Sequence, residues 1–441
     1  MQRELYVFMD LAGETVFVGR LWARVRGGRP SSSFVYADDW RGRRDAFALS
    51  PSLPLVEGQF HSNEPLFPAF TDPAPDSWGQ KLMRRSERAR AEQEGRQPRT
   101  LFDIDFLAGV DDRTRLGALR FKNPNDARFL TTTGTPVPPL IDLPALLGAT
   151  DRIDRGRETN NDIALVLAPG TSLGGARPKA SVRDKDGRLL VAKFPKQDDD
   201  WPVTRWEAVA LTLARAAGLT TPEWRFETIA RRAVLLLGRF DRVGPGGRVP
   251  FMSAMTALDA TDHGNQHSYL ELVDFLRQQS SKPDEDLRQL WRRIVFNILI
   301  SNTDDHLRNH AFLRDAQGWS LSPAYDMNPC PVDVKPRIHA LAIDELDGTG
   351  SLNLALSVAP RFGIKRDEAN AIVAEVGAAV SDWRSVAKAL KLKPAQIDRM
   401  ASAFEHDDLR QATRAAGEPV AAMGLKKKAN KKRPKIVEAA R

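Results

Sequence analysis

The stretch NILISNTDDHLRNHAFL at 297–313, followed by LSPAYDMNP at 321–329, decides the fold. Apolar periodicity predicts a helix over 287–300 that ends just before the polar run. Beyond that run, HAFLR at 310–314 and WSLS at 319–322 predict two strands joined by a Gly-containing turn, which is a β-hairpin. Because a hairpin folds the chain back on itself, we expect the polar residues on its two sides to lie close together.

These polar residues have the spacing of a phosphate-transfer loop. Asp304 and Asn309 are five positions apart, as in the D-x-x-x-x-N pattern of kinases. There the Asp deprotonates the attacking hydroxyl and the Asn binds magnesium, and Asp326 could supply a second metal ligand. Each residue alone is more often a turn or capping residue. Together they predict an ATP- and Mg²⁺-dependent phosphotransferase.

Lys193 lies in RLLVAKFP at 188–195, a predicted strand with apolar residues on both faces. A lysine on such a strand needs an anionic partner, because unpaired burial of its charge is costly. We expect that partner to be the phosphates of ATP, with Glu207 on a predicted helix at 204–217 orienting the amine. The alternative is an edge lysine that reaches water.

Two further segments fit a nucleotide site. In SLGGARPK at 172–179, paired glycines would let backbone N–H groups approach a phosphate. The loop matches neither a Walker A sequence nor G-x-G-x-x-G. GRFDR at 238–242 ends the last predicted strand of this region, where a kinase hinge would receive adenine, although an ordinary strand end is the simpler interpretation.

The order of patterns predicts an α+β, protein-kinase-like bilobal fold with an added N-terminal module. Short alternating strands characterise the first region, a Thr- and Pro-rich stretch the second, strands with one helix the third, and amphipathic helices the fourth. The predicted parts are a β-rich module at 1–125, a linker at 126–159, a small lobe at 160–245, a helical large lobe at 246–424 and a basic, disordered tail at 425–441.

The net charge of +8 is concentrated at the C-terminal end. From residue 421 onward there are eight Lys or Arg against one Glu, which accounts for seven of the eight charges. We interpret the tail as a solvated arm, with a contact to DNA as the alternative. The single cysteine, Cys330, excludes an internal disulfide and indicates a reducing, cytoplasmic setting. No apolar run could span a membrane, and the N-terminus lacks a signal-peptide core.

Taken in order, SLGGARPKA, VAKFP, LLLGRFDR, NILISNTDDHLRNHAFL and LSPAYDMNP resemble the HipA family of serine/threonine kinase toxins. VFVGRLW at 16–22, ALSPSLPL at 48–55 and FLAGVDDRTRLGALRF at 106–121 resemble its N-terminal module. The resemblance covers nearly the whole chain apart from the basic tail.

The resemblance implies a role for each matching residue. Asp304 would be the catalytic base, Ser172 the autophosphorylated loop serine, Glu207 the orienting acid, and Asn309 and Asp326 the magnesium ligands. ATP would be bound by the following residues: Gly174, Gly175, Ala176, Arg177, Pro178, Lys179, Lys193, Gly238, Arg239, Phe240, His306, Leu307, Arg308, Asn309, Tyr325 and Asp326. An acidic residue stands in the best-known member where this chain has Gly238, which leaves adenine affinity open.

The family likeness also implies partners. It suggests a helix-turn-helix antitoxin of HipB type, DNA through that complex, and an aminoacyl-tRNA synthetase as a protein substrate. Three other interpretations stay open from the residues. One is a kinase-fold enzyme that phosphorylates a small molecule. Another is a zinc hydrolase using His306 and His310 with Asp304 and Asp305. The last is a DNA-binding assembly factor acting through the tail.

Overall fold

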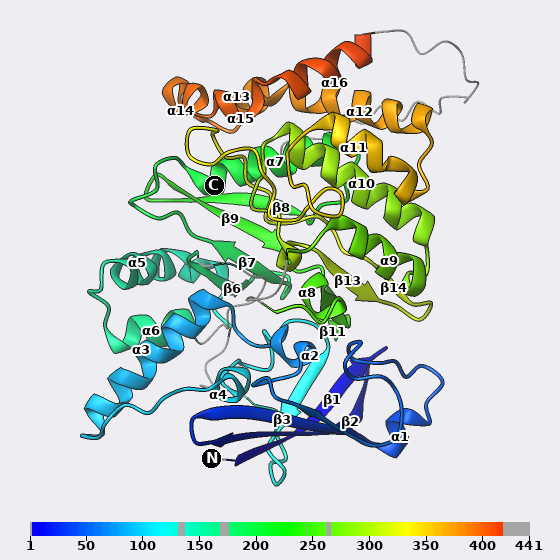
Figure 1. Cartoon of the computed structure of the whole chain (residues 1–441). Coiled ribbons are helices and arrows are strands. Elements are labelled where there is room, and N and C mark those ends of the chain that lie inside the picture. The colour runs from blue at the N-terminus through cyan, green and yellow to red at the C-terminus, as the bar shows by residue number, and fades with distance from the viewer. Residues whose placement is uncertain are drawn as a thin grey trace.

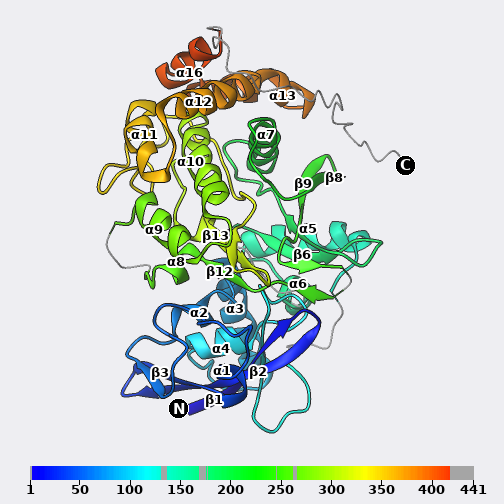
Figure 2. The same cartoon turned by 90° about the vertical axis from the view of Figure 1, so that its right-hand side faces the viewer.

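The computed structural model describes residues 2–130, 137–167, 175, 177–244, 246–261 and 266–417. Ser172, Gly174, Ala176 and the predicted tail lie outside these ranges. Figures 1 and 2 show three parts, in which an N-terminal module lies beneath a β-rich small lobe and a helical large lobe. The predicted α+β class is confirmed.

The N-terminal module is a five-stranded antiparallel sheet in the order β4-β3-β2-β1-β5. Alternation along the strands turns apolar side chains such as Leu5, Val7 and Met9 inward, where they are buried. Residues of α1, α2 and α4 lie in the same buried cluster as these strands. Its elements are β1 (Gln2–Leu11), β2 (Glu14–Arg26), β3 (Arg29–Tyr36), α1 (Asp38–Arg41), β4 (Gln59–Ser62), α2 (Pro68–Thr71), α3 (Ser77–Gln93), α4 (Asp103–Ala108) and β5 (Leu119–Lys122).

The small lobe is a four-stranded antiparallel sheet in the order β6-β7-β9-β8. One helix, α7, crosses it and supplies Glu207 from its buried face. The elements are β6 (Lys179–Arg183), β7 (Leu189–Lys193), α7 (Val203–Ala216), β8 (Trp224–Ile229) and β9 (Arg232–Gly238), followed by the short pair β10 (Arg242–Val243) and β11 (Gly247–Arg248).

The predicted linker at 126–159 was wrong in its second half. There η1 (Leu140–Asp142) leads into α5 (Leu143–Asp154), and α6 (Asn160–Leu167) follows. Leu143, Leu146 and Leu147 pack in one buried cluster with small-lobe residues such as Val182 and Ala192. This segment therefore extends the small lobe, because its apolar stripe needs a partner surface.

The large lobe is mostly helical and also carries the predicted hairpin, which β12 extends to three strands in the order β12-β13-β14. Its elements are β12 (Phe251–Ser253), α8 (Ala254–Ala257), α9 (Tyr269–Gln279), α10 (Pro283–Leu299), η2 (Leu307–Asn309), β13 (Ala311–Arg314), β14 (Trp319–Leu321), α11 (Leu352–Val358), η3 (Ala359–Phe362), α12 (Arg366–Ser381), α13 (Trp383–Ala389), α14 (Pro394–Arg399), α15 (Ala401–Phe404) and α16 (Asp407–Gly417). Helices α14 and α15 are both short and are separated by one residue, Met400. Within the described ranges, no helix has the length and apolar character needed to cross a membrane.

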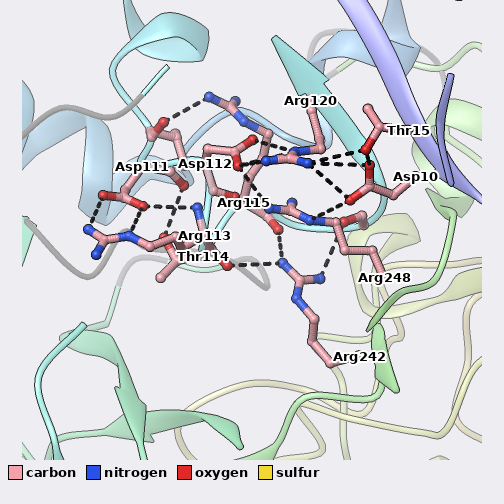
Figure 3. Close-up of polar contacts among 12 residues, drawn as sticks. Asp10, Thr15, Asp111, Asp112, Arg113, Thr114, Arg115, Arg120, Arg242 and Arg248 are labelled. Atoms are coloured by element: carbon pink, nitrogen blue, oxygen red, sulfur yellow. Dashed lines mark hydrogen bonds and ion pairs between the residues drawn. The ribbon is translucent and has the colours of Figure 1, made fainter. Parts of the chain in front are cut away.

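A cluster of arginines and aspartates joins the N-terminal module to the hairpin β10–β11 (Figure 3). Arg248 contacts Asp10 and Asp112, and Arg242 donates to the carbonyl oxygen of Arg115. Asp241 accepts from the backbone N–H of Gly117 at 2.8 Å. The module is thus fixed to the segment that links the two lobes.

Candidate active site

The centre of the site is the ammonium group of Lys193. Its Nζ lies 2.6 Å from Oε1 of Glu207 on α7 and 2.7 Å from Oδ1 of Asp326, beyond the hairpin. The three side chains come from β7, α7 and a large-lobe loop, so the site spans both lobes. Since Lys193 and Glu207 are nearly buried, each charge depends on its partner.

The protonation of these groups follows from their contacts. Burial alone would lower the pKa of Lys193, but the carboxylates of Asp326 and Glu207 outweigh it and hold that pKa above its usual value. Burial raises the pKa of Glu207 despite Lys193, whereas the lysine charge outweighs burial at Asp326 and lowers the pKa of that carboxyl. The arrangement is an ammonium held between two acids of unequal strength.

The loop 302–309 lies against the segment that carries Asp326. The hydroxyl of Tyr325 donates to the carbonyl oxygen of Arg308 at 2.8 Å, and the side-chain oxygen of Asn302 accepts from the N–H of Asn328 at 3.2 Å. Asp326 itself adopts a left-handed backbone with φ of 57°. The hairpin therefore brings together the two polar segments that the sequence separates.

Asp304 and Asn309 are arranged differently from each other. The side chain of Asp304 is 76% exposed and lies 3.5 Å from the ammonium of Lys335. The amide nitrogen of Asn309 donates to the carbonyl oxygen of Asp304 at 3.0 Å, which leaves its Oδ1 as the available metal ligand. An amide oxygen and the Asp326 carboxylate are hard ligands of the kind that Mg²⁺ takes beside phosphate oxygens.

Asp305, next to Asp304, is buried and points the other way. Its Oδ2 accepts from the hydroxyl of Tyr269, from Asn297 at 2.8 Å and makes a 2.8 Å contact with Nε2 of His310. Sequence reasoning missed this network, whose members lie on three different elements. It holds the loop in place, and it removes Asp305 and His310 from the proposed zinc site.

No zinc site is found in the part of the chain that the structure describes, where no group of three or more His, Cys, Asp or Glu could hold a metal ion. Leu307, predicted to contact ATP, is only 4% exposed and packs in the main core. His306 precedes η2, and its backbone N–H donates to the carbonyl oxygen of Asp304. The zinc interpretation therefore has no geometric support.

The predicted adenine segment is partly engaged in the fold. The N–H groups of Gly238 and Arg239 already donate to Glu223 and Leu189, so neither is available to adenine. The guanidinium of Arg239 is buried against Asp241 at 2.6 Å. Among these residues, the ring of Phe240 lies beside that of Tyr325, with centroids 5.4 Å apart. Only Phe240 thus presents a group suited to a flat ring.

The described end of the glycine-containing loop is paired with acids. Arg177 contacts Asp199, and Pro178 accepts from the N–H of Phe194 at 3.0 Å. Lys179 is buried beside Asp76 of the N-terminal module, with Nζ 2.5 Å from Oδ2. Neither Asp76 nor Asp199 was expected from the sequence, because an acidic residue far along the chain gives no local sign of its partner.

The chain matches two models of protein domains. Residues 10–103 match the model of the HipA N-terminal domain, and residues 171–383 match that of the HipA-like C-terminal domain. The chain belongs to the HipA family. The two matched domains occur in the order that the sequence motifs predicted.

Individual relatives are distant. The chain is 25% identical over 318 residues to Y4mE of Sinorhizobium fredii, which carries a provisional kinase name; this spans 67% of the chain and 71% of that protein. It is 26% identical over 170 residues to Toxin YjjJ of Escherichia coli, or 36% of the chain and 38% of that protein. The fold of the chain is similar to that of HipA from Shewanella oneidensis MR-1, which was solved with HipB and operator DNA. The TM-score is 0.63 and the sequence identity 17%, and the match covers 93% of this chain and 96% of the HipA chain.

Proposed function

We propose that the chain is an ATP- and Mg²⁺-dependent serine/threonine protein kinase, a HipA-type toxin that also phosphorylates its own Ser172. The observation that carries the proposal is the ammonium of Lys193 held between Glu207 and Asp326 at the meeting of the two lobes. This is the lysine–glutamate pair that a kinase needs in place beside its metal-binding aspartate.

In this proposal each side chain of the site has a separate role. ATP would supply the transferable phosphoryl group, with Mg²⁺ neutralising charge on its phosphates. Lys193 would hold the phosphates, Asn309 and Asp326 would hold the metal, and Asp304 would take the proton from the substrate hydroxyl. The 76% exposure of Asp304 favours a protein substrate, because an open carboxylate can be reached by a side chain on a folded surface.

The proposal is tested with the purified full chain, labelled ATP and Mg²⁺. We expect phosphate on Ser172, identified by mass spectrometry, and its loss in Asp304→Asn by about 10²-fold or more. Chelation of Mg²⁺ should stop transfer as well. If the wild-type chain phosphorylates neither itself nor any protein of a lysate, the kinase assignment is wrong. ATP consumption that depends on the small-molecule fraction of that lysate would favour the metabolite kinase instead.

The proposed partners are tested separately. We propose a small helix-turn-helix antitoxin of HipB type, DNA bound through that complex, and an aminoacyl-tRNA synthetase as the protein target. Co-purification with an adjacent helix-turn-helix protein, and a shift of operator DNA by the pair, would support this assembly. Removal of residues 425–441 tests the tail: unchanged DNA affinity would assign DNA binding to the antitoxin alone.

A further inference from the structure

Two lysines project over the same face of the small-lobe sheet. Lys179 on β6 and Lys193 on β7 are directly opposite partners in the antiparallel register, so their side chains are close neighbours. Like charges placed opposite each other need anions nearby. Lys193 has Glu207 and Asp326, whereas the carboxylate beside Lys179 comes from outside the kinase lobes.

That carboxylate is Asp76 of the N-terminal module. Its Oδ2 lies 2.5 Å from Nζ of Lys179, and the two side chains are only 6% and 4% exposed. The other oxygen, Oδ1, accepts from the N–H of Gly79 at 2.8 Å and caps α3. Because one carboxylate serves both contacts, the position of Lys179 is tied to the start of α3.

Helix α3 is itself firmly seated against the small lobe. Trp78 and Leu82, in its first two turns, are buried in one cluster with Ala180, Val182 and residues of α5. A second contact holds α3 to the small lobe: Nη1 of Arg85 lies 2.6 Å from Oε1 of Glu158. Asp76 thus lies at the start of a helix that is packed against the small lobe.

The residue beside Asp76 contacts the glycine-containing loop. The hydroxyl of Ser77 donates to the carbonyl oxygen of Gly175 at 3.2 Å, and Nζ of Lys179 lies 3.4 Å from the same oxygen. A Cβ added at Gly175 would meet Nζ of Lys179 at 3.4 Å and Oδ2 of Asp326 at 4.0 Å. Gly175, Lys179 and the proposed metal ligand Asp326 therefore converge at one point.

We propose that Asp76, assisted by Ser77, is a positioning residue of the nucleotide site, through which the N-terminal module sets the affinity for the ATP phosphates. The inference rests on the proposed function. Asp326 lies close to Lys179, because a Cβ at Gly175 would contact both side chains, and the charge of Lys179 favours the ionised form of that carboxyl. Without Asp76, Lys179 would lose a buried anionic partner and be drawn towards Asp326. The ammonium would then compete for the carboxylate that the metal requires.

Asp76→Asn is the informative variant, because asparagine caps a helix about as well as aspartate and leaves α3 intact. We expect the dissociation constant and KM for ATP to rise about tenfold, with kcat changed less than twofold. The inhibition constant of adenosine, which lacks phosphates, should stay within twofold of the wild-type value. Asp76→Glu, which restores the carboxylate, should recover part of the affinity.

A double-mutant cycle tests whether Asp76 acts through Lys179. In a Lys179→Met background, Asp76→Asn should have no further effect on ATP affinity, whereas independent roles would give multiplied effects. Glu158→Gln is the matched control, since it breaks another ion pair of α3 without touching the loop, and it should leave ATP affinity unchanged.

The outcomes separate the inference from the function on which it rests. If the wild-type chain binds no ATP in calorimetry, the proposed function fails. If it binds ATP and Asp76→Asn binds equally well or more tightly, the inference alone is wrong. If Asp76→Asn lost as much affinity for adenosine as for ATP, Asp76 would have only a structural role and the inference would be wrong. An equal loss of ATP affinity in Glu158→Gln would lead to the same conclusion.

Discussion

At the scale of single residues, Asp304 and Asp305 are adjacent in the sequence but lie in opposite surroundings. Asp304 is exposed, while Asp305 is buried in a network with Tyr269, Asn297 and His310. Burial would raise the pKa of Asp305, but the contact with His310 and the donated hydrogen bonds outweigh it and lower that pKa. One carboxylate therefore holds the loop in place, and the other stays exposed to solvent.

Asp326 combines a charge with a strained backbone, and two variants separate them. Asp326→Asn should lower the proposed phosphate transfer about 10²-fold or more, because the proposed metal ligand, which also pairs with Lys193, loses its charge. Asparagine tolerates the left-handed region, whereas alanine at φ of 57° costs about 1–2 kcal/mol. Asp326→Ala should therefore unfold at lower denaturant than Asp326→Asn. Equal midpoints for the two variants would contradict the backbone argument.

At the scale of elements, helices of the large lobe depend on polar groups at their ends. His406 precedes α16: its Nδ1 accepts from the N–H of Leu409 at 3.3 Å, and its Nε2 lies 3.2 Å from the carbonyl oxygen of Leu299. Both contacts are satisfied by a neutral ring. Burial, together with the charge of Arg337, lowers the pKa of His406 to about 4.

The docking of α16 should therefore weaken in acid. The folded-state pKa lies below the unfolded value of about 6.5, so this stabilisation is complete above pH ~6.5 and is lost as pH falls towards 4. The free energy of stabilisation lost in this way would approach about 3 kcal/mol at pH 4. Hydrogen exchange of α16 as a function of pH measures it. His406→Asn, which stays neutral, should show no change across this window; the same pH dependence in that variant would exclude His406 as the cause.

At the scale of the whole molecule, the buried charge cluster joins three parts of the chain. Asp241 is fully buried between Arg239 and Arg242, while Gly117 of the N-terminal module donates to it. Burial would raise the pKa of Asp241, but the two guanidinium groups hold it well below its usual range. Burial lowers the pKa of Arg115 to about 10 and that of Arg242 to about 9. The cluster is stable only as a complete set.

Asp241→Asn should accordingly destabilise the protein by about 3–5 kcal/mol at neutral pH, since it leaves buried arginines unpaired. A carboxyl with a depressed pKa stabilises above its unfolded value of about 3.9, and this contribution is lost as pH falls. The difference in free energy of unfolding between wild type and variant, measured in urea, should therefore be largest at pH 7 and should shrink below pH 4. A difference that does not depend on pH would show that packing, and not charge, dominates.

The sequence by itself determined the local elements, the order of the domains and the proximity of the two polar segments around the hairpin. These follow from apolar periodicity and short loops, which act over a few residues. It also contained a missed signal: Leu143, Leu146, Leu147 and Ile153 have helical spacing and form α5, where a linker was predicted.

Apart from the pair of Lys193 and Glu207, which the kinase pattern predicted, only the tertiary structure decided which charges are paired. Asp76 reaches Lys179, and Arg248 reaches Asp10 and Asp112, across long stretches of chain. The structure also decided that the N–H groups of Gly238 and Arg239 donate to carbonyl oxygens of the small lobe and so are not available to a ligand. Such contacts depend on how whole elements pack, and a charged residue interacts with whatever packing places beside it. Spacing along the chain carries no information about that partner.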